Sequence, residues 1–124
     1  MPFVESDFFI AIFKERDWLK SKSIKAYEKY KGQLWTSPSV IAELLLISEE
    51  FGLDPENIIA HVYQLVDVKD LDEVTAVRAA HFMKEEKVTP FDALHAAYAQ
   101  NDCVLSSDSV YDKLGIQRIK LESE

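Results

Sequence analysis

The fold is decided by residues 88–116, VTPFDALHAAYAQNDCVLSSDSVYDKLGI, a pattern that indicates a helix, a turn, a short apolar strand and a last helical turn. Thr89 and Pro90 are typical of a helix start, because threonine caps the first turn and proline needs no amide hydrogen bond there. Cys103–Leu105 is short and apolar enough to be a strand buried on both faces. The SSD tripeptide at 106–108 follows at once. A carboxylate is therefore expected just beyond the carboxyl end of a buried strand, where open α/β folds place their sites.

The remaining chain continues this alternation of short apolar segments with helical patterns. Strands are expected near 3–5, 33–36, 65–68, 103–105 and 117–121. Helices are expected at about 6–16, capped by Ser6 or Asp7, and at 19–30, 38–51, 55–63, 70–87 and from 90 onward. The apolar residues of the amphipathic helix at 70–87 are Leu71, Val74, Val77 and Phe82. Alternating elements predict an α/β protein, a small three-layer α/β/α domain with a mostly parallel central sheet.

The composition indicates one globular domain spanning residues 1–124. Hydrophobic residues make up 48% of the chain, which is enough for a core that needs no disulfides. Cys103 is the only cysteine, so we expect no disulfide framework and no cysteine-ligated metal. The longest apolar run, Phe8–Phe13, is too short to cross a membrane, and Glu5 and Asp7 lie where a secretion signal would carry positive charge. The sequence therefore predicts a cytoplasmic protein with no membrane partner.

The net charge of −8 argues against a protein that coats nucleic acid non-specifically, but the charge is unevenly spread. The segment Lys14–Lys31 carries seven of the fourteen basic residues and only three acidic ones, so it has a charge of +4 and the rest of the chain −12. Such a run is either a solvated helical face or an edge that contacts phosphates. The candidates for phosphate contact are Lys14, Arg16, Lys20, Lys22 and Lys25.

One carboxylate is out of place in its surroundings. Glu43 is the only charged residue in SPSVIAELLLIS, residues 37–48, a run apolar enough to lie against the core. An unpaired carboxylate buried there would cost several kcal/mol, so it needs a partner. The alternative is that Glu43 reaches the helix edge or meets a lysine or arginine.

Four more carboxylates follow strands or begin helices, and in a parallel sheet these positions meet at one edge. They are Glu5, Asp7, Asp92 and Asp108. Each also has a purely structural interpretation, because acids cap helices and are favoured in first helical turns. Carboxylates at such short distances repel one another unless a cation neutralises them. A site whose ligands are all oxygen atoms suits Mg²⁺ or Mn²⁺. Such an ion polarises phosphoryl oxygens and activates water, as phosphodiester hydrolysis requires.

Four ordered blocks resemble the PIN-domain family, most of all the small VapC-type toxin ribonucleases of prokaryotic toxin–antitoxin pairs. The blocks are FVESDFFIAIF at 3–13, TSPSVIAELL at 36–45, TPFDALHAAYA at 89–99 and VLSSDSVYDKLGI at 104–116. The third contains the family's small-residue pattern, here Ala93, Ala96, Ala97 and Ala99. The first departs from the family, since Glu5 stands where an aspartate is usual.

The resemblance implies that Glu43, Asp92 and an acid of the first block hold the metal, while Asp108 completes the ring or orients water. The first-block acid is either Glu5 or, in a shifted register, Asp7. Ser106 would be the helper hydroxyl beside them. The resemblance assigns no role to His95, which is expected to be a surface or packing residue. Arg78 is expected either to neutralise one of the acids or to face solvent, and Asp112 is a weaker candidate ligand.

The expected function is a metal-dependent endoribonuclease that cleaves RNA by metal-activated water. The resemblance also implies an antitoxin partner lying over the acidic pocket and a homodimer. One alternative is a PIN-like domain without catalysis that binds RNA or assembles a complex, an interpretation that Glu5 supports. Another is a phosphoacceptor receiver domain, which would use Asp67 and Lys120.

Overall fold

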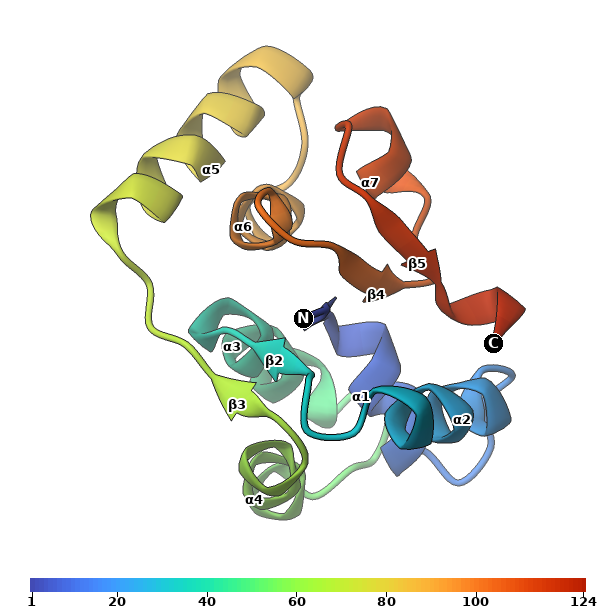
Figure 1. Cartoon of the computed structure of the whole chain (residues 1–124). Coiled ribbons are helices and arrows are strands. Elements are labelled where there is room, and N and C mark those ends of the chain that lie inside the picture. The colour runs from blue at the N-terminus through green and yellow to red at the C-terminus, as the bar shows by residue number, and fades with distance from the viewer.

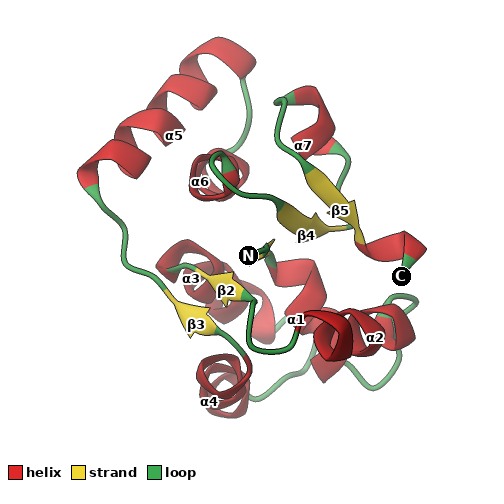
Figure 2. Cartoon of the chain, in the orientation of Figure 1, coloured by secondary structure: helices red, strands yellow, loops and turns green.

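The computed structural model describes all residues 1–124 and contains a five-stranded sheet with helices on both faces (Figures 1 and 2). The strands are β1 (Phe3–Val4), β2 (Trp35–Thr36), β3 (Asp67–Val68), β4 (Val104–Ser106) and β5 (Arg118–Lys120). The helices are α1 (Ser6–Phe13), α2 (Lys20–Tyr30), α3 (Pro38–Ser48), α4 (Pro55–Leu65), α5 (Glu73–Glu86), α6 (Pro90–Ala99), α7 (Val110–Lys113) and the 3-10 turn η1 (Leu121–Ser123). The predicted three-layer α/β/α architecture is confirmed, and the sheet is parallel throughout.

The sheet topology places the start of the chain in the middle of the domain. The strand order is β3-β2-β1-β4-β5, so the chain builds outward from β1 to one edge and then crosses back to build the other half. Phe3 of β1 pairs with Trp35 of β2 on one side and with Val104 of β4 on the other. The order reverses between β1 and β4, and open α/β sheets bind ligands at this kind of switch point, beyond the carboxyl ends of the strands.

Several helix boundaries differ from the predictions; the third helix, for example, ends at Ser48 and not near Phe51. The first helix ends at Phe13 instead of near Arg16, because the ammonium group of Lys20 donates hydrogen bonds to the carbonyls of Ile12 (2.9 Å) and Lys14 (2.7 Å). Glu5, and neither Ser6 nor Asp7, occupies the N-cap position of α1. The fifth helix begins at Glu73 instead of Asp70.

A capping side chain accounts for the late start of α5. Asp72 accepts a hydrogen bond from the amide of Thr75 (2.8 Å) and so fixes the first turn one residue before Glu73. The threonine-proline start of α6 is confirmed in the same terms, since the Thr89 hydroxyl accepts from the amide of Asp92 (3.3 Å).

The alanine pattern of α6 lets this helix pack on two sides. Ala96 and Ala99 belong to the main core beside the sheet, whereas Ala93 and Ala97 form a second small cluster with Ala79 of α5. Small side chains allow close backbone approach on both faces, so α6 lies between the sheet and α5, which extends as an arm along the domain (Figure 1).

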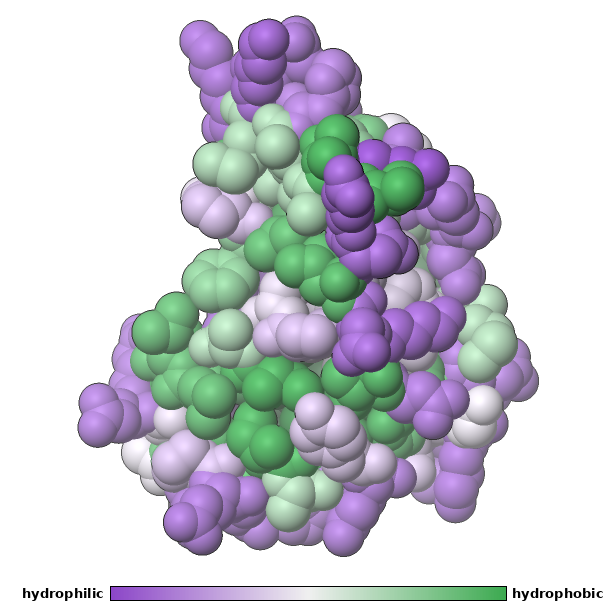
Figure 3. Space-filling model, turned by 90° about the vertical axis from the view of Figure 1, so that its left-hand side faces the viewer, coloured by the Kyte–Doolittle hydropathy of each residue, from purple (hydrophilic) through white to green (hydrophobic).

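The predicted apolar side of α5 is mostly uncovered, in contrast to the expectation for an amphipathic helix. Leu71, Val74 and Val77 are 48%, 60% and 61% exposed, and only Phe82 packs against the core. Figure 3 faces this side of the molecule and shows hydrophobic surface on it. The helix instead buries Ala79 and Thr75, because the close α5–α6 contact leaves no room for larger side chains.

No helix in the structure combines the length and the apolarity that crossing a bilayer requires.

The packing predicts that alanine substitutions at two helical isoleucines, one buried and one exposed, lower the free energy of unfolding by very different amounts. Ile58 in α4 is 2% exposed, whereas Ile24 in α2 is 47% exposed. Replacing Ile58 with alanine should lower the free energy of unfolding in urea by about 2–4 kcal/mol, because it leaves a cavity in the core. The matched Ile24→Ala variant should change it by less than about 0.5 kcal/mol. Equal effects of the two substitutions would contradict the described core.

Candidate metal centre

The site begins at Glu5, directly after the central strand β1. Its side chain is 7% exposed and accepts hydrogen bonds at both oxygens, from the Ser6 hydroxyl at Oε1 (2.9 Å) and from the Ser106 hydroxyl at Oε2 (2.7 Å). Ser106 is the last residue of β4, and its side chain is fully buried. The predicted helper hydroxyl therefore lies beneath the site and joins the two strands that flank the switch point.

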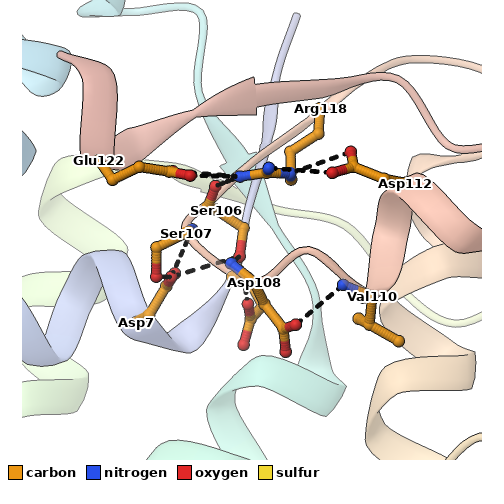
Figure 4. A network of polar contacts seen from close by, with 9 residues as sticks. Asp7, Ser106, Ser107, Asp108, Val110, Asp112, Arg118 and Glu122 are labelled. Atoms are coloured by element: carbon orange, nitrogen blue, oxygen red, sulfur yellow. Dashed lines mark hydrogen bonds and ion pairs between the residues drawn. The ribbon is translucent and has the colours of Figure 1, made fainter.

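Asp7 lies two residues after Glu5, in the first turn of α1, and faces the loop that follows β4. Its Oδ2 accepts from the backbone amide (2.7 Å) and the hydroxyl (2.6 Å) of Ser107, and the Ser106 hydroxyl lies 3.3 Å away. Its Oδ1 is buried and has no hydrogen-bond partner. Figure 4 shows this carboxylate clamping the Ser106–Asp108 loop against α1.

Glu43 approaches the same place from α3, which starts directly after β2 with Ser37 as its cap. Its side chain is 20% exposed, and Oε1 is buried without a hydrogen-bond partner. No lysine or arginine pairs with it, contrary to the structural alternative; its nearest basic group is His95, with Nε2 at 4.0 Å from Oε1.

Asp92 and Asp108 form the outer part of the cluster. Asp92 is half-buried in the first turn of α6. Asp108 is exposed, and its Oδ1 accepts from the amide of Val110 (2.9 Å), the first residue of α7, although the N-cap position of that helix belongs to Ser109. Both can therefore meet a ligand that arrives from solvent.

The electrostatics show that the five carboxylates act on one another. Burial, and next the charge of Asp7, raises the pKa of Glu5 well above its usual range. Burial also raises the pKa of Asp7, Glu43 and Asp92. The charges of Asp92, Asp7 and Asp108 raise the pKa of Glu43 further, and Asp108 does the same for Asp92. The predicted convergence of these acids on one site is present in the structure.

His95 is fully buried among these acids, one helical turn after Asp92. Burial lowers its pKa to about 3, so the imidazole is neutral. Its Nδ1 lies 3.4 Å from the hydroxyl of Tyr111, and its Nε2 has no hydrogen-bond partner. Glu5, Glu43 and His95 each offer one ligand atom, and these three atoms lie within 4.8 Å of one another.

The donor set fits a divalent cation. No lysine, arginine or N-terminal amine lies within 4.0 Å of any of the five carboxylates, while the cation pairs of the chain lie elsewhere. Buried oxygens of Asp7 and Glu43 lack hydrogen-bond partners. Unpaired buried carboxylate oxygens are costly, and an ion bound by hard oxygen ligands would satisfy them.

Behind the site, Arg118 fixes the loop that carries Ser106 and Asp108. Its guanidinium donates to the Ser106 carbonyl (3.0 Å), to both oxygens of Asp112 (3.1 and 3.0 Å) and to both oxygens of Glu122 (Figure 4). Its side chain is only 4% exposed. Asp112 thus pairs with Arg118, whose hydrogen bonds lower the pKa of Asp112. Asp112 therefore helps to fix Arg118 and is not a member of the carboxylate cluster.

Arg78 lies away from the acids, so it neutralises none of them. It lines a cavity of about 500 Å³ at the amino ends of β2 and β4, together with Trp35, Lys69, Asp72 and Tyr98. This is the largest cavity in the molecule, and none of the five clustered carboxylates lines it. We locate the site by the convergent carboxylates, because unpaired buried charges are the stronger sign of ligand binding.

The basic stretch divides into bound and free side chains. Lys20 holds the end of α1, and Lys14 pairs with Asp17 (3.7 Å) and lies over the ring of Phe51. Arg16 and Lys25 are exposed, and Lys22 is half-buried. Their contact with RNA stays a prediction.

Sequence reasoning missed the contributions of Ser107, Tyr111 and Arg118. Of the two expectations for His95, a surface or a packing residue, the structure shows the packing residue, fully buried beside Phe3 and Phe91. The spacing of Asp92 and His95 by three residues did place both on one helix face. Nothing in the sequence showed that this face turns toward Glu43. The role of Arg118 depends on contacts across two elements, so no local pattern marks it.

Solved structures of toxin–antitoxin proteins have the same fold over nearly their whole length. VapC20 of Mycobacterium tuberculosis, a sarcin-ricin loop cleaving toxin, superposes with a TM-score of 0.76 at 16% identity, covering 94% of this chain and 96% of that one. A toxin–antitoxin complex from Klebsiella pneumoniae gives 0.75 at 17% identity, covering 98% of both chains. DNA-bound VapBC from Salmonella typhimurium gives 0.72 at 19% identity, also covering 98% of both.

The sequence comparisons give the family. No curated protein sequence is significantly similar to the chain. The receiver-domain alternative is wrong, because its two key residues, Asp67 and Lys120, lie on β3 and β5 at opposite edges of the sheet. The PIN domain matches residues 3–116, which include all four sequence blocks. The chain belongs to the PIN domain family.

Proposed function

We propose that this protein is a metal-dependent endoribonuclease and the toxin of a toxin–antitoxin pair. The observation that carries the proposal is the set of five carboxylates gathered at the switch point of the sheet with no cation beside them. A bound Mg²⁺ or Mn²⁺ would lower the pKa of its water and polarise a phosphoryl oxygen of the substrate.

We assign each residue a role according to its surroundings. Glu5, Glu43 and Asp92 would hold the ion from three different elements. Asp108, exposed on the rim, would orient the attacking water or accept its proton. Asp7 keeps the loop after β4 in place through Ser107, and its free Oδ1 is a further possible ligand atom.

The RNA substrate is proposed from the resemblance to VapC-type toxin ribonucleases and from the charge pattern. One structural neighbour, VapC20, is a sarcin-ricin loop cleaving toxin. Arg16, Lys22 and Lys25 would attract a phosphate backbone to an otherwise acidic protein. Because α1 runs eight residues from the acids toward this stretch, a distance of roughly 12 Å, bound RNA would extend over several nucleotides.

A protein partner is proposed on two grounds. The structural neighbours include VapBC complexes, in which a toxin is bound to its antitoxin. The exposed apolar residues Leu46, Val74 and Val77 offer surface that a partner would cover. An antitoxin that placed a basic side chain between the carboxylates would also take the place of the ion. The homodimer implied by the family stays a prediction.

The alternative is a PIN domain without catalysis, kept open by Glu5 in place of aspartate. In its favour, the longer side chain is held by two serine hydroxyls. Against it, those same bonds leave Glu5 among the potential ligand atoms with Glu43.

Cleavage of RNA is the direct test of the proposed function. The wild-type protein, freed of any antitoxin, should cleave a mixed pool of structured RNAs in Mn²⁺ or Mg²⁺ and stop when the metal is chelated. Asp92→Asn should lower the cleavage rate by at least about 100-fold, because it removes a ligand charge.

The matched control is Glu73→Gln, which neutralises the first-turn acid of α5 outside the cluster and should keep full activity. Metal-independent cleavage, or equal loss in the two variants, would contradict the proposed site. Folded protein that neither cleaves RNA nor binds metal would favour the non-catalytic alternative.

The repulsion among the acids predicts that, in the metal-free protein, this site contributes less to the free energy of unfolding at neutral pH than at acidic pH. The folded-state pKa of Glu5 is raised, so between its unfolded value and the raised value the folded protein binds more protons. The contribution of Glu5 to the free energy of unfolding is complete below the unfolded pKa of about 4.5. It is lost as the pH rises, at up to about 1.4 kcal/mol per pH unit.

Glu5→Gln should therefore raise the free energy of unfolding at pH 7 in EDTA by about 1 kcal/mol or more and leave it nearly unchanged at pH 4. Asp112→Asn is a control of opposite sign, since the pKa of Asp112 is lowered by Arg118 and its neutralisation should give no stabilisation at pH 7. Urea unfolding followed by circular dichroism measures both. A Glu5→Gln variant less stable than wild type at pH 7 would show that the cluster is not repulsive.

A further inference from the structure

The feature that the carboxylate site leaves unexplained is the free ring nitrogen of His95. The residue is fully buried, so solvent cannot satisfy Nε2, and no protein group does so. This nitrogen shares a small volume with one oxygen each of Glu5 and Glu43, all within 4.8 Å of one another. Buried nitrogens without partners are uncommon and call for a specific explanation.

The distance between His95 and Glu43 is informative. The Nε2–Oε1 separation of 4.0 Å is too long for a hydrogen bond. Two ligands that each lie about 2.1 Å from one ion can be up to about 4.2 Å apart, so the gap is one that a shared ion can bridge. The oxygen that faces Nε2, the buried Oε1 of Glu43, also makes no hydrogen bond.

The second ring nitrogen of His95 has a neighbour of the kind that orients metal-binding histidines. Nδ1 lies 3.4 Å from the hydroxyl of Tyr111, which is itself fully buried. With the ring proton on Nδ1 and directed at this hydroxyl oxygen, the lone pair of Nε2 points at the carboxylates. A ligating histidine usually makes such a bond with its other nitrogen. The rings of Phe3 and Phe91, with centroids at 5.9 and 6.2 Å, further restrict the imidazole.

We propose that His95 is a ligand of the metal ion, through Nε2, together with Glu5 and Glu43. The proposal rests on the metal site of the proposed function and extends it in two respects. It adds a nitrogen to an oxygen-only ligand set, and it moves the ion inward from the rim acids toward the core.

The mixed ligand set has a consequence for metal choice. Imidazole suits transition metals, whereas Mg²⁺ prefers oxygen ligands and retains several waters. The protein should therefore bind Mn²⁺ more tightly than Mg²⁺, and the difference should depend on His95. If His95 instead donated a hydrogen bond to Glu43, it would orient that carboxylate without distinguishing the two ions.

The chain allows a clear test because it contains only three histidines. His61 and His81 lie on α4 and α5, outside the carboxylate cluster. The variant His61→Gln/His81→Gln leaves His95 as the only imidazole in an otherwise intact site. Pulsed electron paramagnetic resonance of this full-length variant with Mn²⁺ alone should show the hyperfine coupling of a directly bound imidazole nitrogen.

His95→Gln should lose that coupling, and its Mn²⁺ affinity measured by calorimetry should fall by roughly 10-fold or more, with a change in Mg²⁺ affinity of less than about 3-fold. If His95→Gln does not fold, the spectrum of the double variant still decides the question. Bound Mn²⁺ without nitrogen coupling would overturn the role of His95 and leave the carboxylate site standing. No Mn²⁺ binding at all would overturn both.

Discussion

The structure depends on one electrostatic constraint, the gathering of five carboxylates where the two halves of a parallel sheet meet. Burial raises the pKa of four of them, Glu5, Asp7, Glu43 and Asp92, and no lysine or arginine lies within 4.0 Å of any of the five. Hydroxyls and amides of Ser106 and Ser107 satisfy several of their oxygens but supply no charge. An arrangement of this kind lowers the stability of the folded protein in the absence of a cation, which supports the proposal that the cluster binds one.

The fold keeps these groups together by rigid means. Glu5 follows β1 and Ser106 ends the paired strand β4. Glu43 lies in the middle of α3 and Asp92 in the first turn of α6, two helices capped by Ser37 and Thr89. Arg118 of β5 holds the carbonyl of Ser106. The strands are only two or three residues long, so the residues of the site lie close in sequence to the buried residues of the sheet. The outer helix α5 packs on α6 through alanines and leaves Val74 and Val77 exposed, the surface on which we propose that a protein partner binds.

Much of this could be predicted from sequence, because the relevant signals are local. Cap residues and prolines predict α3, α4 and α6. The rule that parallel strands end at one edge predicts that Glu5, Glu43, Asp92 and Asp108 meet. The failures concern contacts between elements. The end of α1 depends on Lys20 reaching back to two carbonyls, and the exposure of Val74 and Val77 depends on how closely α5 approaches α6. The orientation of His95 toward Glu43 depends on Tyr111 and Phe3, which come from other elements, as well as on the local ring of Phe91.

The central claim is that these carboxylates share one divalent cation, and the most direct measurement is the number of protons released when Mn²⁺ binds. Calorimetric titration at pH 5.5 in two buffers of different ionisation enthalpy gives this number. Because burial raises the pKa of Glu5, Asp7 and Glu43 in the metal-free protein, metal binding should release protons at this mildly acidic pH, and the release should diminish as the pH is raised toward 8. Binding with no proton release at pH 5.5 would place the ion elsewhere on the protein, and the absence of binding would contradict the claim altogether.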